Sequence, residues 1–135
     1  NQLAMKAGTV LLKKVSQPEF LKDVCKKGDL IRTRLNELKE KVSIIGDIRG
    51  VGLMVGTEFV NPKGQRDLQG SLPASGEIAA KVQKMCFENY LVAEKGGRDG
   101  SVMRCLCALN ISEEDVNKAL DIFEKCVLEI DKEYK

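Results

Sequence analysis

The segment GDIRGVGLMVGTEFV, residues 46–60, decides which fold the chain can adopt. Four glycines fall within its first eleven positions, and alternating residues follow. The alternation over residues 47–60 predicts a strand region, because successive side chains of a strand point to opposite faces. One face would carry Val51, Leu53, Val55, Thr57 and Phe59, and the other Gly52, Met54, Gly56, Glu58 and Val60.

These glycines raise the question of nucleotide binding. A dinucleotide-binding loop needs a strand, then a glycine-rich turn, then a helix whose N-terminus receives the pyrophosphate. Here the glycines precede and enter a strand, and no helix is expected near them. Gly52 and Gly56 lie four residues apart and would share a sheet face, where a helix or another subunit could approach the backbone. The pattern therefore favours packing over nucleotide binding.

Helices are predicted on both sides of this strand. Residues 3–15 have helical composition, and Ser16-Gln17-Pro18-Glu19 resembles a capping box at the start of a second helix. Gly28 lies within the apolar stripe of that helix and indicates close packing against a neighbour. The stripe consists of Phe20, Val24, Ile31, Leu35, Leu38 and Val42. A third helix is expected from Ser75 to Phe87, and a fourth from Ser112 to Ile130 with an acidic first turn.

Two short strands are predicted between the last two helices. They cover residues 90–93 and 102–106, joined by a loop over residues 95–100, and could pair as a hairpin. The resulting class is α+β, with helices covering a small, mostly antiparallel sheet and a long helix preceding it. A chain of 135 residues fits a single domain.

Composition excludes several classes of function. With 22 basic and 20 acidic side chains, the chain has no electrostatic footprint for nucleic acid or an anionic membrane. No apolar run approaches the roughly 20 residues of a membrane span, and no signal peptide is visible. Five cysteines without any histidine predict a reduced, cytoplasmic setting and no metal site. Asn1 already reads as part of a helix, so we expect a piece of a longer protein.

Arg104 is the candidate binding residue. It lies mid-strand in VMRCLCAL and shares a face with Val102 and Leu106. A guanidinium among apolar neighbours needs a partner, and its fork matches the carboxylate of an amino or keto acid. The alternative is a structural salt bridge to Glu58 or Glu94. The neighbouring GGRDG loop (residues 96–100) could bind an anion through its amides, although a flexible hairpin connection is the favoured interpretation.

Several segments together resemble one family. The segments NQLAMKAGTVLL, GDIRGVGLMVGTEFV, ENYLVAEKGGRDGSVMRCLCALNISEEDV and the last helix resemble the C-terminal part of class III pyridoxal-phosphate-dependent aminotransferases, in particular the 2,4-diaminobutyrate:2-oxoglutarate aminotransferases. The resemblance spans nearly the whole chain with its segments in the family's order. It implies a fold-type I homodimer that exchanges an amino group between an amino acid and a keto acid through pyridoxal 5'-phosphate.

The resemblance also assigns roles. In the family, the arginine of a VxRFLPPL-like strand binds a substrate carboxylate, and this position falls on Arg104. The family has phenylalanine and two prolines where this chain has Cys105, Cys107 and Ala108, which puts the shape of the substrate pocket in question. The family's Schiff-base lysine, its cofactor-pairing aspartate and its phosphate loop would all lie before Asn1.

Residues 1–135 are therefore expected to form the small C-terminal domain, without the cofactor-binding domain. We expect no catalytic or cofactor-binding residue within this domain. We also expect that the isolated domain binds no cofactor and has no activity. Its first helix should expose an apolar patch. The alternative is a stand-alone, non-enzymatic dimerisation or partner-binding module derived from the same fold. A third interpretation is a small anion-binding protein that uses GGRDG and Arg104.

Overall fold

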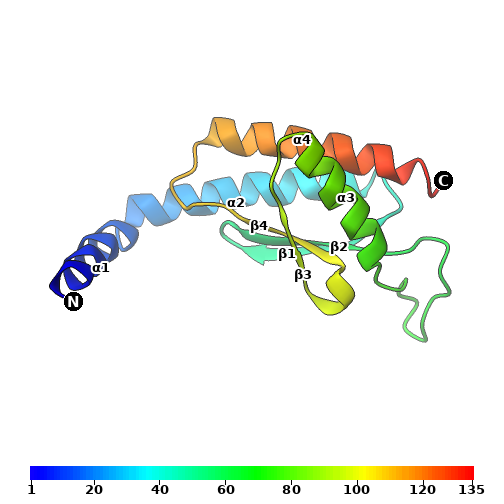
Figure 1. Ribbon diagram of the computed structural model, residues 1–135, viewed down its shortest axis with the longest axis horizontal. Helices are drawn as coiled ribbons and strands as arrows, with labels where there is room; N and C mark the ends of the chain where they lie inside the picture. The colour runs from blue at the N-terminus through cyan, green and yellow to red at the C-terminus, as the bar shows by residue number, and fades with distance from the viewer.

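A four-stranded sheet with helices over one face forms the fold, which is α+β as expected (Figure 1). The computed structural model describes all of residues 1–135. Its elements, in chain order, are α1 (Gln2–Val15), α2 (Pro18–Lys39), β1 (Ile45–Val51), β2 (Met54–Phe59), α3 (Gly76–Glu88), β3 (Glu94–Gly96), the 3₁₀ turn η1 (Arg98–Gly100), β4 (Val102–Leu106) and α4 (Glu113–Asp131). Figure 1 shows α2 and α4 side by side over the sheet, with α1 projecting away from them.

The sheet has the strand order β1-β2-β4-β3, and every neighbouring pair is antiparallel. The prediction of one strand region over residues 47–60 was wrong, because that segment forms the hairpin β1–β2. Gly52 lies in the turn with φ of 54°, a left-handed conformation that glycine adopts without strain. Gly52 and Gly56 therefore do not share a strand. The apolar residues Val51, Leu53 and Val55 alternate straight through the turn, which hid it, although Val51 lies on the exposed face opposite Met54 and not on the buried face of Val55.

The core lies between the sheet and the three helices α2, α3 and α4. On β2, Val55, Thr57 and Phe59 are buried against the helices, whereas Met54 points away and is exposed. The helices contribute most of the predicted apolar stripes, including Ile31 of α2 and Val82 of α3, but Val42 lies beyond the end of α2 and Phe87 of α3 is exposed. Burial of these stripes supplies the main stabilising term of the fold.

Close packing of two glycines joins α2 to the first hairpin. A Cβ atom built on Gly28 would lie 2.3 Å from the carbonyl oxygen of Gly52 and 2.7 Å from its carbonyl carbon. No real side-chain carbon tolerates such distances, so the hairpin can approach α2 only where the helix carries glycine. This confirms the expected close packing at Gly28 and the packing role of Gly52. The hairpin turn is followed by β2 and not by a helix, so it lacks the arrangement of a dinucleotide loop.

Two of the three predicted helix caps are confirmed. The side chain of Ser75 accepts a hydrogen bond from the amide of Ile78, and that of Ser112 accepts one from Asp115. The capping box at Ser16 was wrong. Because α1 extends to Val15, the Ser16 hydroxyl meets the free carbonyls of that helix end and donates to Leu12 at 2.7 Å.

The predicted strand over residues 90–93 was also wrong, and β3 begins at Glu94 instead. Residues 90 and 91 end α3: Tyr90 has φ of 66°, and the amide of Leu91 donates to the carbonyl of Cys86. A left-handed residue just after a helix satisfies its last carbonyls in this way. The hairpin β3–β4 forms as predicted but starts later, and β3 takes in Lys95 and Gly96, which were expected to be loop.

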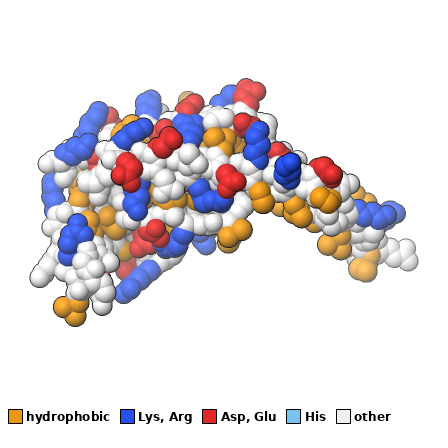
Figure 2. All heavy atoms as spheres, turned by 180° about the vertical axis from the view of Figure 1, so that it is seen from behind, with side chains coloured by type: hydrophobic (Ala, Val, Ile, Leu, Met, Phe, Trp, Pro, Cys, Tyr) orange, Lys and Arg blue, Asp and Glu red, His pale blue; other side chains and the backbone are white.

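Helix α1 has no buried residue. Five of its apolar side chains are more than half exposed, namely Leu3, Met5, Val10, Leu11 and Leu12, and apolar side chains run along the projecting arm (Figure 2). The expected exposed apolar patch on this helix is confirmed. None of the helices combines the length and apolar character needed to cross a membrane.

Candidate carboxylate-binding site

On the sheet face opposite the helices, one row of aligned residues crosses all four strands. Its members are charged on every strand except β2, which contributes a glycine. The antiparallel register aligns Arg49 of β1, Gly56 of β2, Arg104 of β4 and Glu94 of β3. Side chains directly opposite each other in a sheet share a face, so two guanidinium groups stand on either side of a residue without a side chain. A second row on the same face, Val51, Met54 and Leu106, is apolar and exposed.

The two arginines of this row differ in how fully they are paired. Arg49 lies 2.8 Å from Asp47 and 2.6 Å from Glu58, and the hydrogen bonds that its guanidinium donates to these two carboxylates raise its pKa. Arg104 has one carboxylate partner, Glu94, at 2.5 Å from its Nη2 atom. Its side chain is 42% exposed, so it is not the buried charge that its apolar sequence neighbours suggested. A guanidinium has several N–H donors in a fixed fork, so Arg104 retains donors for a ligand.

The expected salt bridge of Arg104 therefore exists, and its partner is Glu94 rather than Glu58. This contact does not exclude carboxylate binding, since a surface ion pair contributes only about 0–1 kcal/mol. A ligand carboxylate could share the guanidinium with Glu94 or take its place. The chemistry that the exposed guanidinium offers at this site is the recognition of an anion.

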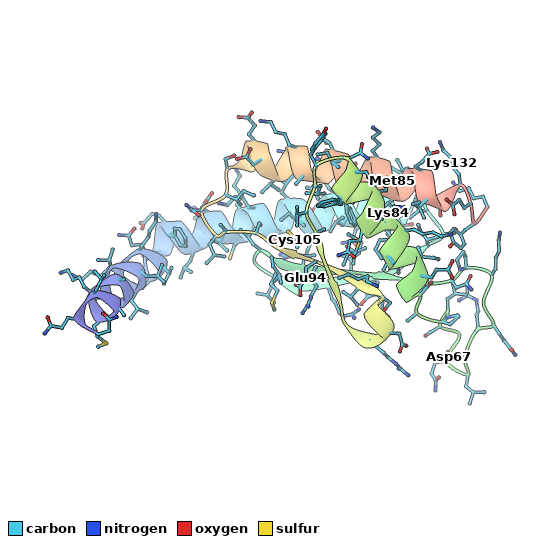
Figure 3. The ribbon with its side chains drawn as sticks, in the orientation of Figure 1. Asp67, Lys84, Met85, Glu94, Cys105 and Lys132 are labelled. Atoms are coloured by element: carbon cyan, nitrogen blue, oxygen red, sulfur yellow. The ribbon has the colours of Figure 1, made fainter.

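An apolar cavity of about 360 Å³ adjoins Arg104 on the helix side of β4. Strand β3 pairs with β4 only up to Arg104, so Cys105 and Leu106 have no strand partner on that edge, and both line the cavity. Cys105, which is labelled in Figure 3, and Cys107 line the cavity, and their Sγ atoms lie 3.8 Å apart. Burial raises the pKa of Cys105 to about 11, and the neighbouring thiol adds to this effect. The Cys105 thiol is therefore protonated and unreactive near neutral pH.

The cavity does not fit pyridoxal 5'-phosphate. No lysine is among its lining residues, and the only basic residue there, Arg104, carries its guanidinium on the opposite face of the sheet. The one buried lysine of the chain, Lys27, binds Asp23 at 2.6 Å and donates to the carbonyls of Leu109 and Ile111. That amine fixes α2 to the segment before α4 and is not free to react with an aldehyde.

The GGRDG loop uses part of its own backbone for internal bonds. The amide of Gly100 donates to the carbonyl of Gly97, and that of Ser101 donates to Arg98. The Ser101 hydroxyl donates to the same Arg98 carbonyl. Two amides that an anion would need are thus already engaged, which favours the interpretation of this loop as a hairpin connection.

Sequence reasoning missed the part that Gly96 plays at this site. A Cβ atom built on Gly96 would lie 2.6 Å from Nη2 of Arg104, so the guanidinium rests directly over this glycine. The sequence predicts a loop at Gly96-Gly97, whereas Gly96 belongs to strand β3. No local pattern reveals such a contact, because it depends on the pairing of β3 with β4.

Comparisons with known proteins agree with this arrangement. The family model for the class III aminotransferases matches residues 1–127. The diaminobutyrate–2-oxoglutarate aminotransferase of Haemophilus influenzae is 36% identical over 129 residues, which is 96% of this chain and 28% of that protein. The alanine/serine racemase of Pyrococcus horikoshii is 33% identical over 94% of this chain and 25% of its own length. The chain thus spans about a quarter of the length of these curated relatives.

Solved structures show the same fold. A phospholyase from Arthrobacter, in complex with phosphoethanolamine, superposes with a TM-score of 0.79 at 20% identity, covering 90% of this chain and 28% of that one. The acetylornithine aminotransferase from Elizabethkingia anophelis superposes with a TM-score of 0.65 at 25% identity. The superposition covers 85% of this chain and 25% of that one. From the family match across nearly all of its length and the shared fold, the chain belongs to the class III aminotransferases.

Proposed function

We propose that residues 1–135 are the C-terminal small domain of a pyridoxal-phosphate-dependent aminotransferase. The enzyme would transfer an amino group between 2,4-diaminobutyrate, or a similar ω-amino acid, and 2-oxoglutarate or glutamate. The observation that carries the proposal is the 36% identity to the diaminobutyrate–2-oxoglutarate aminotransferase of Haemophilus influenzae across 96% of the chain. The matching relatives are about four times as long as this chain, which supports its place in a larger protein.

Arg104 is the residue that we assign to the substrate. Its exposed guanidinium with one carboxylate partner can bind the carboxylate of an amino or keto acid through parallel hydrogen bonds. The cofactor supplies the electron sink for the exchange when it is bound in the whole enzyme. Because the cavity of this chain contains no lysine, the cofactor would be held by other residues. We also propose a cytoplasmic homodimer, in keeping with five free cysteines and with the family.

The isolated chain should then neither bind pyridoxal phosphate nor transaminate. The test is to titrate the chain with the cofactor and follow its absorbance, with the product of the whole gene as the matched control. For residues 1–135 we expect no saturable spectral change and no glutamate formation. For the product of the whole gene we expect a saturable spectral change and the formation of glutamate. Stoichiometric cofactor binding with turnover by the isolated chain would contradict the proposal.

The stand-alone module is the alternative function, and the exposed apolar residues of α1 are the observation that favours it, since they would suit a partner surface. The two proposals differ in what is encoded ahead of the Asn1 codon. About 300 in-frame residues with a lysine at a strand end and a phosphate loop would support the enzyme. A start codon directly before Asn1 would support the module. Saturable binding of 2-oxoglutarate to the isolated chain would instead favour the anion-binding protein.

The reaction class needs its own control because one relative at 33% identity is named a racemase. A transaminase requires a keto acid as acceptor, whereas a racemase interconverts the enantiomers of one amino acid without it. The whole gene product should therefore consume 2,4-diaminobutyrate only when 2-oxoglutarate is present. Loss of optical activity without any keto acid would indicate racemisation and would contradict the proposed reaction.

A further inference from the structure

Strand β3 holds the guanidinium of Arg104 from two directions. Glu94 faces Arg104 directly in the register of β3 and β4, and its carboxylate lies 2.5 Å from Nη2. Two residues further along β3, Gly96 lies beneath the same group. The three atoms nearest to a Cβ built on Gly96 all belong to the guanidinium: Nη2 at 2.6 Å, Cζ at 3.1 Å and Nε at 3.3 Å.

The backbone does not explain why residue 96 is glycine. Gly96 is a paired residue of β3 and does not have a positive φ, whereas Gly97 beside it has φ of 73°. An alanine could therefore adopt the conformation of Gly96 without strain. A strand interior also disfavours glycine in general, because glycine loses more backbone entropy than other residues and leaves nothing to pack. The space that the guanidinium occupies is the remaining reason for glycine at this position.

We propose that Gly96 is a positioning residue for substrate recognition, which acts by leaving room for the Arg104 guanidinium against β3. The inference rests on the proposed function of Arg104 and adds the residue that sets where its fork lies. A side chain at position 96 would push the guanidinium off the strand, because the far end of an arginine moves more readily than a paired backbone. The fork would then no longer face the carboxylate with both of its N–H donors.

The expected defect is specific to the carboxylate that Arg104 binds. A displacement of about 1 Å at a positioning group can lower activity by orders of magnitude, and loss of a single charge-assisted hydrogen bond corresponds to a factor of about 10 or more. The carboxylate makes its bonds in the bound substrate and in the transition state alike. We therefore expect Gly96→Ala to raise the KM for 2-oxoglutarate about tenfold with little change in kcat.

The test is a double-mutant cycle in the product of the whole gene. Its variants are Gly96→Ala, Arg104→Ala and their combination, with Gly8→Ala as the control because no atom lies within 4 Å of a Cβ built there. If Gly96 acts through Arg104, the double variant will have the same KM as Arg104→Ala alone. Additive increases in KM, or no increase for Gly96→Ala while Arg104→Ala is impaired, would overturn the inference. An unchanged KM in Arg104→Ala would instead remove the proposed role of Arg104 itself.

A second measurement does not depend on activity. In ¹⁵N-labelled chain, the Nε–H resonance of Arg104, identified by its loss in Arg104→Lys, should shift strongly in Gly96→Ala and stay in place in Gly8→Ala. An unmoved resonance would overturn the inference. If Gly96→Ala impairs folding, its stability cost should disappear in the Arg104→Ala background, where the space is free. An equal cost in both backgrounds would show that glycine serves the backbone, which would also overturn the inference.

Discussion

Replacement of Gly28 by alanine tests the packing that places the first hairpin on α2. The new methyl group would lie 2.3 Å from the carbonyl oxygen of Gly52 and 2.7 Å from its carbonyl carbon. Ordinary contacts of this kind are at about 3.5 Å or more, so helix and hairpin would have to separate by about 1 Å. The obstructing atoms are backbone, which cannot turn aside as a flexible side chain would.

Two opposing effects set the size of the change. Alanine in place of glycine in a helix interior is favourable by about 1 kcal/mol. Overpacking a close contact costs typically about 1–3 kcal/mol and sometimes more. Because the contact here is between two backbones, we expect a cost at or above the upper end of that range. The net result should be a loss of about 2 kcal/mol in the free energy of unfolding, or a Tm lower by roughly 6–10 °C for a chain of this size.

Urea and thermal unfolding followed by circular dichroism will measure this loss, and Gly8→Ala is the matched control. Gly8 is also a helix residue, but nothing lies within 4 Å of a Cβ built there. Gly8→Ala should have a Tm at or slightly above that of the wild type and a stronger helix signal. The reasoning would be refuted if Gly28→Ala were as stable as the wild type, because helix propensity would then outweigh the contact with Gly52.

Three further outcomes are expected. Burial acts to raise the pKa of Asp131, but hydrogen bonds from Ser43 and Lys135 lower this pKa overall. The ionised Asp131 carboxylate therefore stabilises the folded chain. This stabilisation is complete above the ordinary carboxyl pKa of about 4 and is lost as the pH falls through the lower pKa of the folded state. Asp131→Asn should flatten the pH dependence of urea midpoints below about pH 5, and an unchanged slope would count against this. Burial raises the pKa of Cys86 to about 12, whereas Cys25 is exposed; iodoacetamide should label Cys25 in the native chain and Cys86 only after unfolding, and equal native rates would contradict this. Helix α1 should make the isolated chain self-associate, which sedimentation at rising concentration will detect; a monomer at every concentration would speak against it.

Periodicity predicted the helices, and capping chemistry located the starts of α3 and α4 but not that of α2. The stripe from Phe20 to Leu38 repeats at helical spacing, and the hydroxyls of Ser75 and Ser112 lie where a helix must begin. These signals are local, because each depends on residues within one or two turns. The same holds for Gly28, whose place in an apolar stripe indicated a close neighbour.

Strand boundaries could not be predicted because they depend on contacts between distant segments. Apolar residues alternate from Val51 through Leu53 to Val55, so the turn at Gly52 left no break in the sequence, although Val51 and Val55 lie on opposite faces of the sheet. Residues 90–93 have the composition of a strand, but Tyr90 and Leu91 are used to end α3. At the candidate site, Arg104 stood out as a charge within an apolar strand. The contact between Arg104 and Gly96 could not be predicted, because it arises only when β3 pairs with β4.

The most direct test of the account is the dependence of transamination on Arg104. The product of the whole gene should be assayed with 2,4-diaminobutyrate and varied 2-oxoglutarate, as wild type, Arg104→Lys and Arg104→Ala. Loss of charge-assisted hydrogen bonds predicts that Arg104→Ala lowers kcat/KM for 2-oxoglutarate about 10- to 100-fold. Arg104→Lys should be impaired less than Arg104→Ala, because it keeps the charge without the fork. Wild-type kcat/KM in Arg104→Ala would contradict the account, and Arg104 would then be only the partner of Glu94.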